Sequence, residues 1–256
     1  MDELIRELKT QGVLKSPNVE AAFRAIDRKD FVRPEYEEVA YANHPLPIGE
    51  GQTISQPYTV AFMLDLLDPK AGEKILDVGS GSGWTTALLA HIVSQSGEID
   101  ENGGIGTSAA EGGLVGRHQF HQAKPRLPDG QGFTKRSDSP ISSGCVFAIE
   151  LMPELCKFGE ANVAKYNFIK KNIAKFLCRD GTLGLPKEAP FDKILTSAAA
   201  LAVIPPAWRE QLRVGGAIVA PVGSSVWRYR QVSETAWQEE KSPGFAFVPL
   251  VTKNGE

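Results

Sequence analysis

A glycine-rich turn between two apolar segments carries the strongest chemical signal in the sequence. The apolar run 74–78 leads into residues 79–83, GSGSG, and a helical pattern follows over residues 84–93. Glycines allow positive φ and let a ligand approach the main chain closely, and the start of the following helix favours a negative group. The pattern predicts a ligand site where a strand turns into a helix, and a turn without a ligand is the weaker interpretation.

The spacing of these glycines separates two classes of cofactor. The dinucleotide fingerprint is G-x-G-x-x-G. Counted from Gly79, its third glycine would fall at Trp84; counted from Gly81, it would fall at Thr86, so both alignments fail. An acid at the end of the strand before G-x-G-x-G, here Asp77, is instead typical of methyltransferases. The spacing therefore favours S-adenosyl-L-methionine over a dinucleotide.

Two further acids follow predicted strands. Glu150 ends the second strand, where a carboxylate can accept hydrogen bonds from both hydroxyls of a ribose, and Asp180 ends the third, where it could bind an adenine amino group. Glu150 lies 71 residues after Gly79, but the separation is 27 without the 44-residue segment 100–143, which is a normal βαβ spacing. Each acid alone could be a solvated loop residue, whereas three acids at successive strand ends indicate one site.

These residues need a scaffold that brings several strand ends together. The predicted strands are 74–78, 146–149, 173–177, 191–195 and 217–220, and the predicted helices after the first strand are 84–93 and 153–166. This alternation predicts an α/β fold, a mostly parallel sheet with helices on both faces. Together with the glycine turn and Asp77 before it, the pattern indicates a Rossmann-like class I methyltransferase fold. A final strand over 245–251 is expected to run antiparallel to its neighbours.

We predict a single domain over residues 1–256. Residues 1–56 form a helical N-terminal extension followed by a loop rich in Pro and Gly over 34–52, and a further helix covers 57–67. Residues 100–143 are poor in branched apolar side chains and show no period, so we expect a flexible insertion. It precedes the second strand and should leave from the edge of the sheet away from the ligand. A tolerated surface loop and a docking or regulatory segment are both open interpretations.

Composition and charge limit the classes of partner, compartment and metal that the sequence leads us to expect. The net charge is −3 and no run of basic residues is present, so a nucleic-acid partner is not expected. No apolar stretch approaches the length that a membrane span needs, and three cysteines without paired spacing indicate reduced thiols in a cytoplasmic protein. We expect a monomer. We also expect no metal, because no cluster of cysteines or acids accompanies His118 and His121 to complete a metal site. Cys145, Cys156 and Cys178 are expected to be packing residues.

Two blocks of sequence make a resemblance specific. The first is 41–63, YANHPLPIGEGQTISQPYTVAFM, and the second runs from the alanines 198–200 through Ile204-Pro205 to Pro221-Val222-Gly223. With these blocks, the whole chain outside 100–143 resembles the protein-L-isoaspartate O-methyltransferase family. The resemblance implies methylation of the free carboxylate of L-isoaspartyl residues in damaged proteins and peptides, which starts their repair. D-aspartyl residues are a second substrate that it leaves open.

The resemblance also implies roles for individual residues. Ser55 is the implied catalytic hydroxyl; its alternative role is a helix N-cap, since Pro57 opens a predicted helix two residues later. Implied cofactor contacts are Gln52, Thr53, Ile54, Asp77, Gly79, Ser80, Gly81, Glu150, Asp180 and Gly181. Implied substrate-side residues are Asn43, Pro45, Ser197 and Ala198.

The chain departs from the family pattern at two of the substrate-side positions. Asn43 stands where the family usually has aspartate in Y-x-D-x-P, and Ser197 stands where glycine is common. These departures leave two rivals open. One is a methyltransferase of the same fold acting on another carboxylate or a small molecule, and the other is a binding module that recognises cofactor or isoaspartate without turnover.

Overall fold

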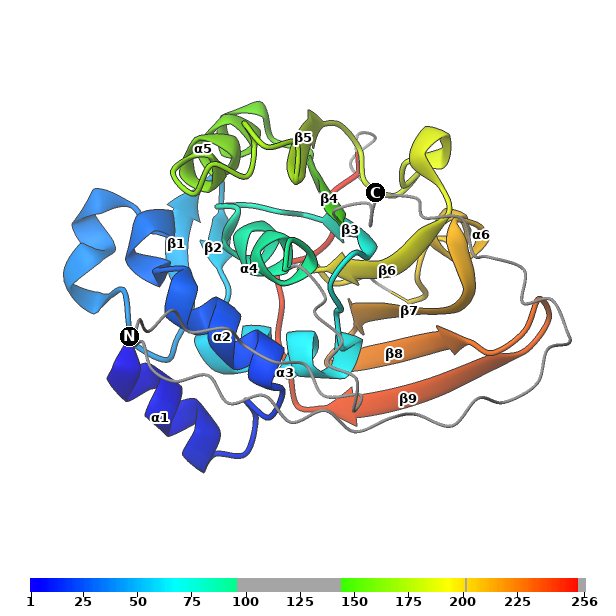
Figure 1. The fold of residues 1–256 in the computed structure, drawn as a ribbon, viewed down its shortest axis with the longest axis horizontal. Coiled ribbons are helices and arrows are strands. Elements are labelled where there is room, and N and C mark those ends of the chain that lie inside the picture. Colours follow the sequence, from blue (N-terminus) through cyan, green and yellow to red (C-terminus); the bar gives the residue numbers. More distant parts are fainter. Residues whose placement is uncertain (96–143, 201, 253–256) are drawn as a thin grey trace, which may run out of the picture. The chain divides into compact units, whose positions relative to one another are not determined.

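A seven-stranded sheet organises the protein (Figure 1). The computed structural model describes residues 1–95, 144–200 and 202–252. The strand order is β5-β4-β3-β6-β7-β8-β9, and the first five strands in this order are parallel. Their bounds are β3 Lys74–Val78, β4 Cys145–Glu150, β5 Ala174–Cys178, β6 Phe191–Thr196 and β7 Leu212–Val222. The predicted fold class is confirmed, and each of the five predicted parallel strands is present.

Alternating side chains bury both faces of this sheet, as the period of two along a strand requires. In β3, Ile75 joins one apolar cluster, while Leu76 and Val78 join the other. The helices of the first cluster are α1 Asp2–Thr10, α2 Pro17–Ala25, α3 Pro57–Leu67, α4 Trp84–Val93 and α5 Pro153–Ala164. The second face is covered by the short α6, Pro206–Glu210, through the buried Trp208.

The helix after the glycine turn is apolar on every side because it is covered on every side. All residues of α4 are buried except His91. The helix contacts β3 and β4 beneath it and α2 and α5 beside it. Phe23 of α2 meets Trp84 edge to face, with ring centroids 5.4 Å apart. The N-terminal extension therefore holds the turn and its helix in place from outside.

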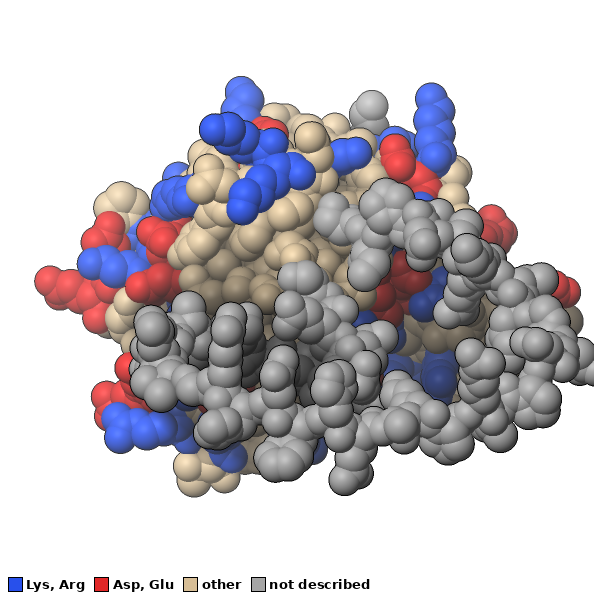
Figure 2. Space-filling model, in the orientation of Figure 1, with Lys and Arg blue, Asp and Glu red and all other residues tan. Residues whose placement is uncertain are grey.

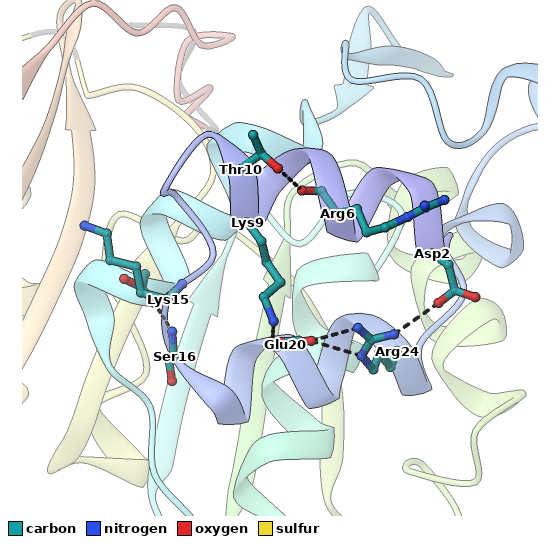
Figure 3. Close-up of polar contacts among 9 residues, drawn as sticks. Asp2, Arg6, Lys9, Thr10, Lys15, Ser16, Glu20 and Arg24 are labelled. Atoms are coloured by element: carbon teal, nitrogen blue, oxygen red, sulfur yellow. Dashed lines mark hydrogen bonds and ion pairs between the residues drawn. The ribbon is translucent and has the colours of Figure 1, made fainter.

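Helices α1 and α2 pair through a buried stripe and an exposed charge cluster. Leu4, Ile5 and Leu8 are buried. On the surface, Glu20 accepts hydrogen bonds from Lys9 and Arg24 (Figure 3). Lys9 and Arg24 are half exposed, so these ion pairs contribute little. Burial of the apolar stripe is the main attachment of α1.

Two predictions about strands are wrong. Residues 34–52, expected to form a loop, contain β1 Leu46–Gly49, which pairs antiparallel with β2 Gln52–Ile54. The expected antiparallel strand near the C-terminus is present but not over 245–251, which contribute one isolated parallel bridge, between Ala199 and Pro249. The antiparallel strands near the C-terminus are β8 Ser225–Gln231 and β9 Trp237–Pro243. Strand β9 is an edge strand whose side chains are mostly exposed, so its sequence lacks the apolar signal of a strand.

The predicted insertion 100–143 lies outside the described residues, but the segments on either side of it are defined. A Cβ on Gly144 would lie 2.7 Å from Cβ of Val93, and Cys145 N donates to Glu73 O at 3.0 Å. The end of α4 and the start of β4 are therefore adjacent. Both lie at the edge where β3 and β4 begin, opposite the glycine turn.

Candidate active site

The glycine turn lies where the order of the parallel strands reverses. Strand β3 has β4 on one side and β6 on the other, and the chain crosses from β3 to β4 and later to β6. In open α/β sheets a ligand binds at the carboxyl ends of the strands at such a reversal. Residues 79–83 occupy this position directly after β3.

Close packing explains why glycines stand in the turn. Gly79, Gly81 and Gly83 have φ of 72°, 51° and 84°, which side chains rarely adopt. A Cβ on Gly83 would lie 2.7 Å from the carbonyl oxygen of Gly159 in α5. The main-chain nitrogens of Gly79 and Ser80 both donate to Ile149 O, at 2.8 and 3.1 Å. The turn is thereby fixed to the end of β4.

Glu150 is held rigidly beside the turn. Its Oε2 accepts from Gly81 N at 2.9 Å, and its Oε1 accepts from Met152 N at 3.0 Å. The side chain is almost buried but lines a groove at the strand ends, which we call the strand-end groove. Each carboxylate oxygen has a second lone pair, so this pair of oxygens can accept hydrogen bonds from two neighbouring hydroxyls of a ligand.

Asp77 lies beneath the turn and is fully buried. Its Oδ2 accepts from Thr86 Oγ1 at 2.6 Å, whereas its Oδ1 has no hydrogen-bond partner among the described residues. Burial raises the pKa of Asp77 to about 7; the Thr86 hydrogen bond opposes the shift, and the nearby charge of Glu150 adds to it. Ser80 Oγ is also buried and has no hydrogen-bond partner in the part of the chain that the structure describes. Unpartnered buried polar atoms at a turn of this kind fit a bound polar ligand with a positive group.

Asp180 does not line the strand-end groove. Its Oδ1 accepts from the main-chain nitrogen and the hydroxyl of Thr182, at 2.8 and 2.6 Å, which shapes the turn after β5. The neighbouring Gly181 does line the groove, and a Cβ there would lie 2.4 Å from a methyl group of Val78. The buried Trp208 donates to Gly181 O at 2.9 Å. The turn is fixed, and Asp180 supports it from outside the lining.

The strand-end groove brings together most of the predicted site residues. The predicted residues that line it are Gln52, Thr53, Gly79, Gly81, Glu150, Gly181, Ser197 and Ala198. Ile54 and Ser80 line a smaller crevice beside it, and Asp77 and Asp180 line neither. Leu151, Met152 and the segment Val248–Val251, which no sequence pattern marks as site residues, complete the groove. Including its open mouth, the groove encloses about 590 Å³.

A second hollow, which we call the Ser55 pocket, adjoins the strand-end groove. Thr53, Ser197 and Val248 line both spaces, and Ser55 lines only the second of the two. The polar groups of the Ser55 pocket are the hydroxyls of Thr53, Ser55, Thr59 and Ser197 and the amide of Gln56. No titratable side chain lines it in the described parts of the chain.

The capping alternative for Ser55 is wrong. Helix α3 has Gln56 as its N-cap residue, with no hydrogen bond from that side chain. Asn43 takes over the capping role, because its Oδ1 accepts from Tyr58 N at 3.0 Å. Its Nδ2 donates to Glu7 Oε1 of α1 at 2.8 Å. An aspartate could not make this second bond, so α1 gives a physical reason for an amide at this position.

A buried arginine that no sequence pattern marks holds the loop around Ser55. The guanidinium of Arg28 is fully buried, and it lies over the ring of Trp84 at 5.3 Å. It donates to the main-chain oxygens of Ala40, Ala42, His44 and Ser55. Burial lowers the pKa of Arg28 to about 10, so it stays charged at neutral pH. Arg28 therefore ties the loop before β1 to the segment that carries Ser55.

The cysteines differ from one another in exposure. Cys156 is buried, Cys145 is half-buried and Cys178 is exposed, and none forms a disulfide. The prediction that all three are packing residues is therefore wrong for Cys178. Among the described residues, no helix is long and apolar enough to cross a membrane. His118 and His121 lie outside the described residues.

The sheet order and the groove together define the class of protein. A glycine turn without dinucleotide spacing lies at the reversal point, a rigid acid follows the next strand, and unpartnered polar atoms surround the turn. These features define a class I S-adenosyl-L-methionine-dependent methyltransferase.

Comparison with known proteins identifies the family. The profile described as "Protein-L-isoaspartate(D-aspartate) O-methyltransferase (PCMT)" matches residues 1–137 and 139–255, and the chain belongs to this family. A protein-L-isoaspartate O-methyltransferase of Methanopyrus kandleri is 33% identical over 99% of this chain and 92% of its own length. A relative of the same name from Pyrococcus horikoshii is 33% identical over 98% of this chain and 92% of its own length.

Solved structures show the same fold. A Plasmodium falciparum structure of a protein-L-isoaspartate O-methyltransferase, in complex with S-adenosyl-L-homocysteine, superimposes with a TM-score of 0.70. The alignment covers 97% of this chain and 96% of the other at 20% identity. The likeness extends over nearly the full length of both chains.

Proposed function

We propose that this enzyme methylates the free carboxylate of L-isoaspartyl residues in peptides and proteins, with Ser55 orienting that carboxylate. Family membership supports the activity, and the family description also includes D-aspartate. The observation that carries the site assignment is the neutral, hydroxyl-lined Ser55 pocket, which shares Thr53 and Ser197 with the strand-end groove. The methyl ester can cyclise to a succinimide that reopens in part as normal aspartate, which is repair.

The residues of the strand-end groove fit the cofactor. Glu150 would hold the ribose hydroxyls, and the glycine turn would allow close approach of the main chain. Asp77 beneath the turn would supply a negative charge to the cationic part of the ligand. When bound there, S-adenosyl-L-methionine supplies a methyl group on a positively charged sulfur.

The substrate carboxylate needs positioning rather than proton removal. A carboxyl group has an unperturbed pKa of about 4, so it is already ionised at neutral pH. A general base is therefore unnecessary, in agreement with a pocket lined by hydroxyls and an amide. Ser55 donates one hydrogen bond to the carboxylate and leaves the other oxygen free to react. The apolar Val248 and Phe247 help exclude water, which favours a reaction in which charge is neutralised.

Substitution of Ser55 tests this assignment. We expect Ser55→Ala to lower kcat by roughly tenfold to a hundredfold, because one orienting donor is lost. Cofactor affinity, measured by calorimetry, should stay unchanged, and Ser55→Thr should retain much of the activity because the hydroxyl remains. Unchanged turnover in Ser55→Ala would remove Ser55 from the catalytic role.

Neither rival activity is favoured by a specific observation. The departure at Asn43 is explained by its bonds to Glu7 and Tyr58. Ser197 adds a hydroxyl to the wall between the two hollows and removes nothing from it. The cytoplasmic location and the monomeric state stay predictions from composition.

A further inference from the structure

A third hollow continues from the Ser55 pocket. It is larger than the first two, about 1430 Å³ including its open mouth, against about 710 Å³ for the Ser55 pocket. The residues common to both are Pro45, Gln56, Thr59 and Ala246. The remaining wall comes from Gln11 directly after α1, from Asn43, from the first turns of α3, and from residues 242–245 at the end of β9 and just beyond it. We call this hollow the flank groove.

The flank groove is uncharged and partly aromatic. None of the described residues that line it is acidic or basic. Tyr58, Phe62 and Phe245 supply aromatic surface, and the rings of Phe62 and Phe245 stack with centroids 4.8 Å apart. On the face drawn in Figure 2, charged side chains of both signs gather along the upper and left rim. An uncharged groove beside the Ser55 pocket therefore differs from its surroundings.

Several charged side chains close in sequence to the residues of the flank groove already have partners. Glu7 Oε1 accepts hydrogen bonds from the side-chain amide nitrogens of Asn43 and Gln11, at 2.8 and 2.9 Å. Asp65 Oδ1 accepts from Ser16 N at 2.7 Å. Lys241 lies over the ring of Trp227 at 5.4 Å. Each of these groups already has a partner, so a charge brought into the groove would have to compete with that partner for it.

We propose that the flank groove binds the polypeptide next to the isoaspartyl residue and selects an uncharged, apolar or aromatic neighbour. This inference rests on the proposed function, because it takes the isoaspartyl carboxylate to be in the Ser55 pocket. The shared wall then places an adjoining residue of the same chain in the flank groove. A charged neighbour would lose hydration without gaining a partner, whereas an apolar one would bury surface against Phe62 and Phe245.

A panel of peptides tests the selection. Each peptide carries L-isoaspartate with Phe, Lys or Glu as the residue before it in one series and after it in a second series. In at least one series we expect kcat/KM for Phe to exceed that for Lys and for Glu by on the order of tenfold. Equal values in both series would overturn the inference while leaving the proposed function intact. Absence of methyl transfer to every peptide would instead overturn the proposed function.

Charge substitutions on the shared wall provide a second, independent measurement. Ala246 is exposed and lines both hollows, so a longer side chain there should not disturb folding. Ala246→Lys should raise kcat/KM for the Glu peptide relative to the Lys peptide, and Ala246→Glu should do the reverse. The matched controls are Val232→Lys and Val232→Glu, at an exposed position between β8 and β9. A change in preference that is equal at Ala246 and Val232, or absent at Ala246, would contradict the assignment.

Discussion

Asp77 and Glu150 lie at the ends of neighbouring strands, but Glu150 faces the strand-end groove whereas Asp77 is buried beneath the glycine turn. Glu150 has both oxygens fixed by main-chain nitrogens and still faces the groove. Asp77 lies under the glycine turn, where burial raises its pKa to about 7. Ionisation of buried Asp77 is therefore unfavourable in the protein alone, and a positive group of a ligand above the turn would offset this cost.

This pKa predicts a specific pH dependence of stability. Aspartate in the unfolded chain has a pKa of about 3.9, so protonation of Asp77 stabilises the folded state. That contribution is fully present below about pH 4 and is lost as the pH rises through about 7. We expect Asp77 to lower the free energy of unfolding by up to about 4 kcal/mol over this range. Denaturant unfolding between these pH values should show a smaller decline for Asp77→Asn, and parallel curves for the two proteins would contradict the expected role.

At the residue scale, the sequence predicted many residues that line the strand-end groove but not the residues that hold its surroundings in place. Residue type and strand-end position were enough to select Glu150 and the glycine turn. Arg28 was not selected, because its partners are main-chain oxygens of a loop whose path is set by tertiary contacts. The segment Val248–Val251 was assigned to a strand, although it lines the groove instead.

At the scale of elements, helix α1 supports the substrate side through one side chain. Asn43 caps α3 with its oxygen and bonds Glu7 of α1 with its nitrogen. The side-chain amide of Asn43 therefore joins the loop before β1 to both α3 and α1. Helices α3 and α4 were predictable to the residue because proline, glycine and apolar period mark their ends. The hairpin β1–β2 and the polar strand β9 were not, because their pairing depends on neighbours remote from any local pattern.

A double-mutant cycle tests this junction. Asn43→Asp would bring two carboxylates together at the site of the 2.8 Å bond to Glu7. We expect it to destabilise the fold by about 1–2 kcal/mol in thermal unfolding, since a hydrogen bond becomes a repulsion. In the Glu7→Gln background the same change should cost much less, because the repulsion is absent and a negative group still caps α3. Equal costs in the two backgrounds would show that α1 does not act through Asn43.

At the scale of the whole molecule, the site lies at one edge of the sheet, and the described residues nearest the segment 100–143 on either side, Val93 and Gly144, lie at the other. Val93 and Gly144 are adjacent, although about fifty residues of chain separate them. A short linker could therefore join them. Because the insertion is predicted to leave from the edge of the sheet away from the ligand, we expect the described residues to hold the complete active site.

Deletion tests this organisation. We expect replacement of residues 97–142 by a short Gly/Ser linker to preserve cofactor affinity and kcat, because both ends meet away from the site and the loop-closure cost changes slowly with length. The matched control places the same linker after Leu183, an exposed residue two positions beyond Gly181 of the groove. That insertion should weaken cofactor binding. A deleted protein that folds but no longer binds the cofactor would contradict the proposed organisation.

The most direct test of the central claim is methyl transfer from labelled S-adenosyl-L-methionine to one synthetic peptide in two forms, L-isoaspartyl and L-aspartyl. The two forms share composition and charge, so only the backbone geometry at one residue distinguishes them. We expect label to enter the isoaspartyl form alone. Equal labelling of both forms, or no labelling of either by a protein that binds the cofactor, would contradict the assignment of isoaspartyl methylation to this site.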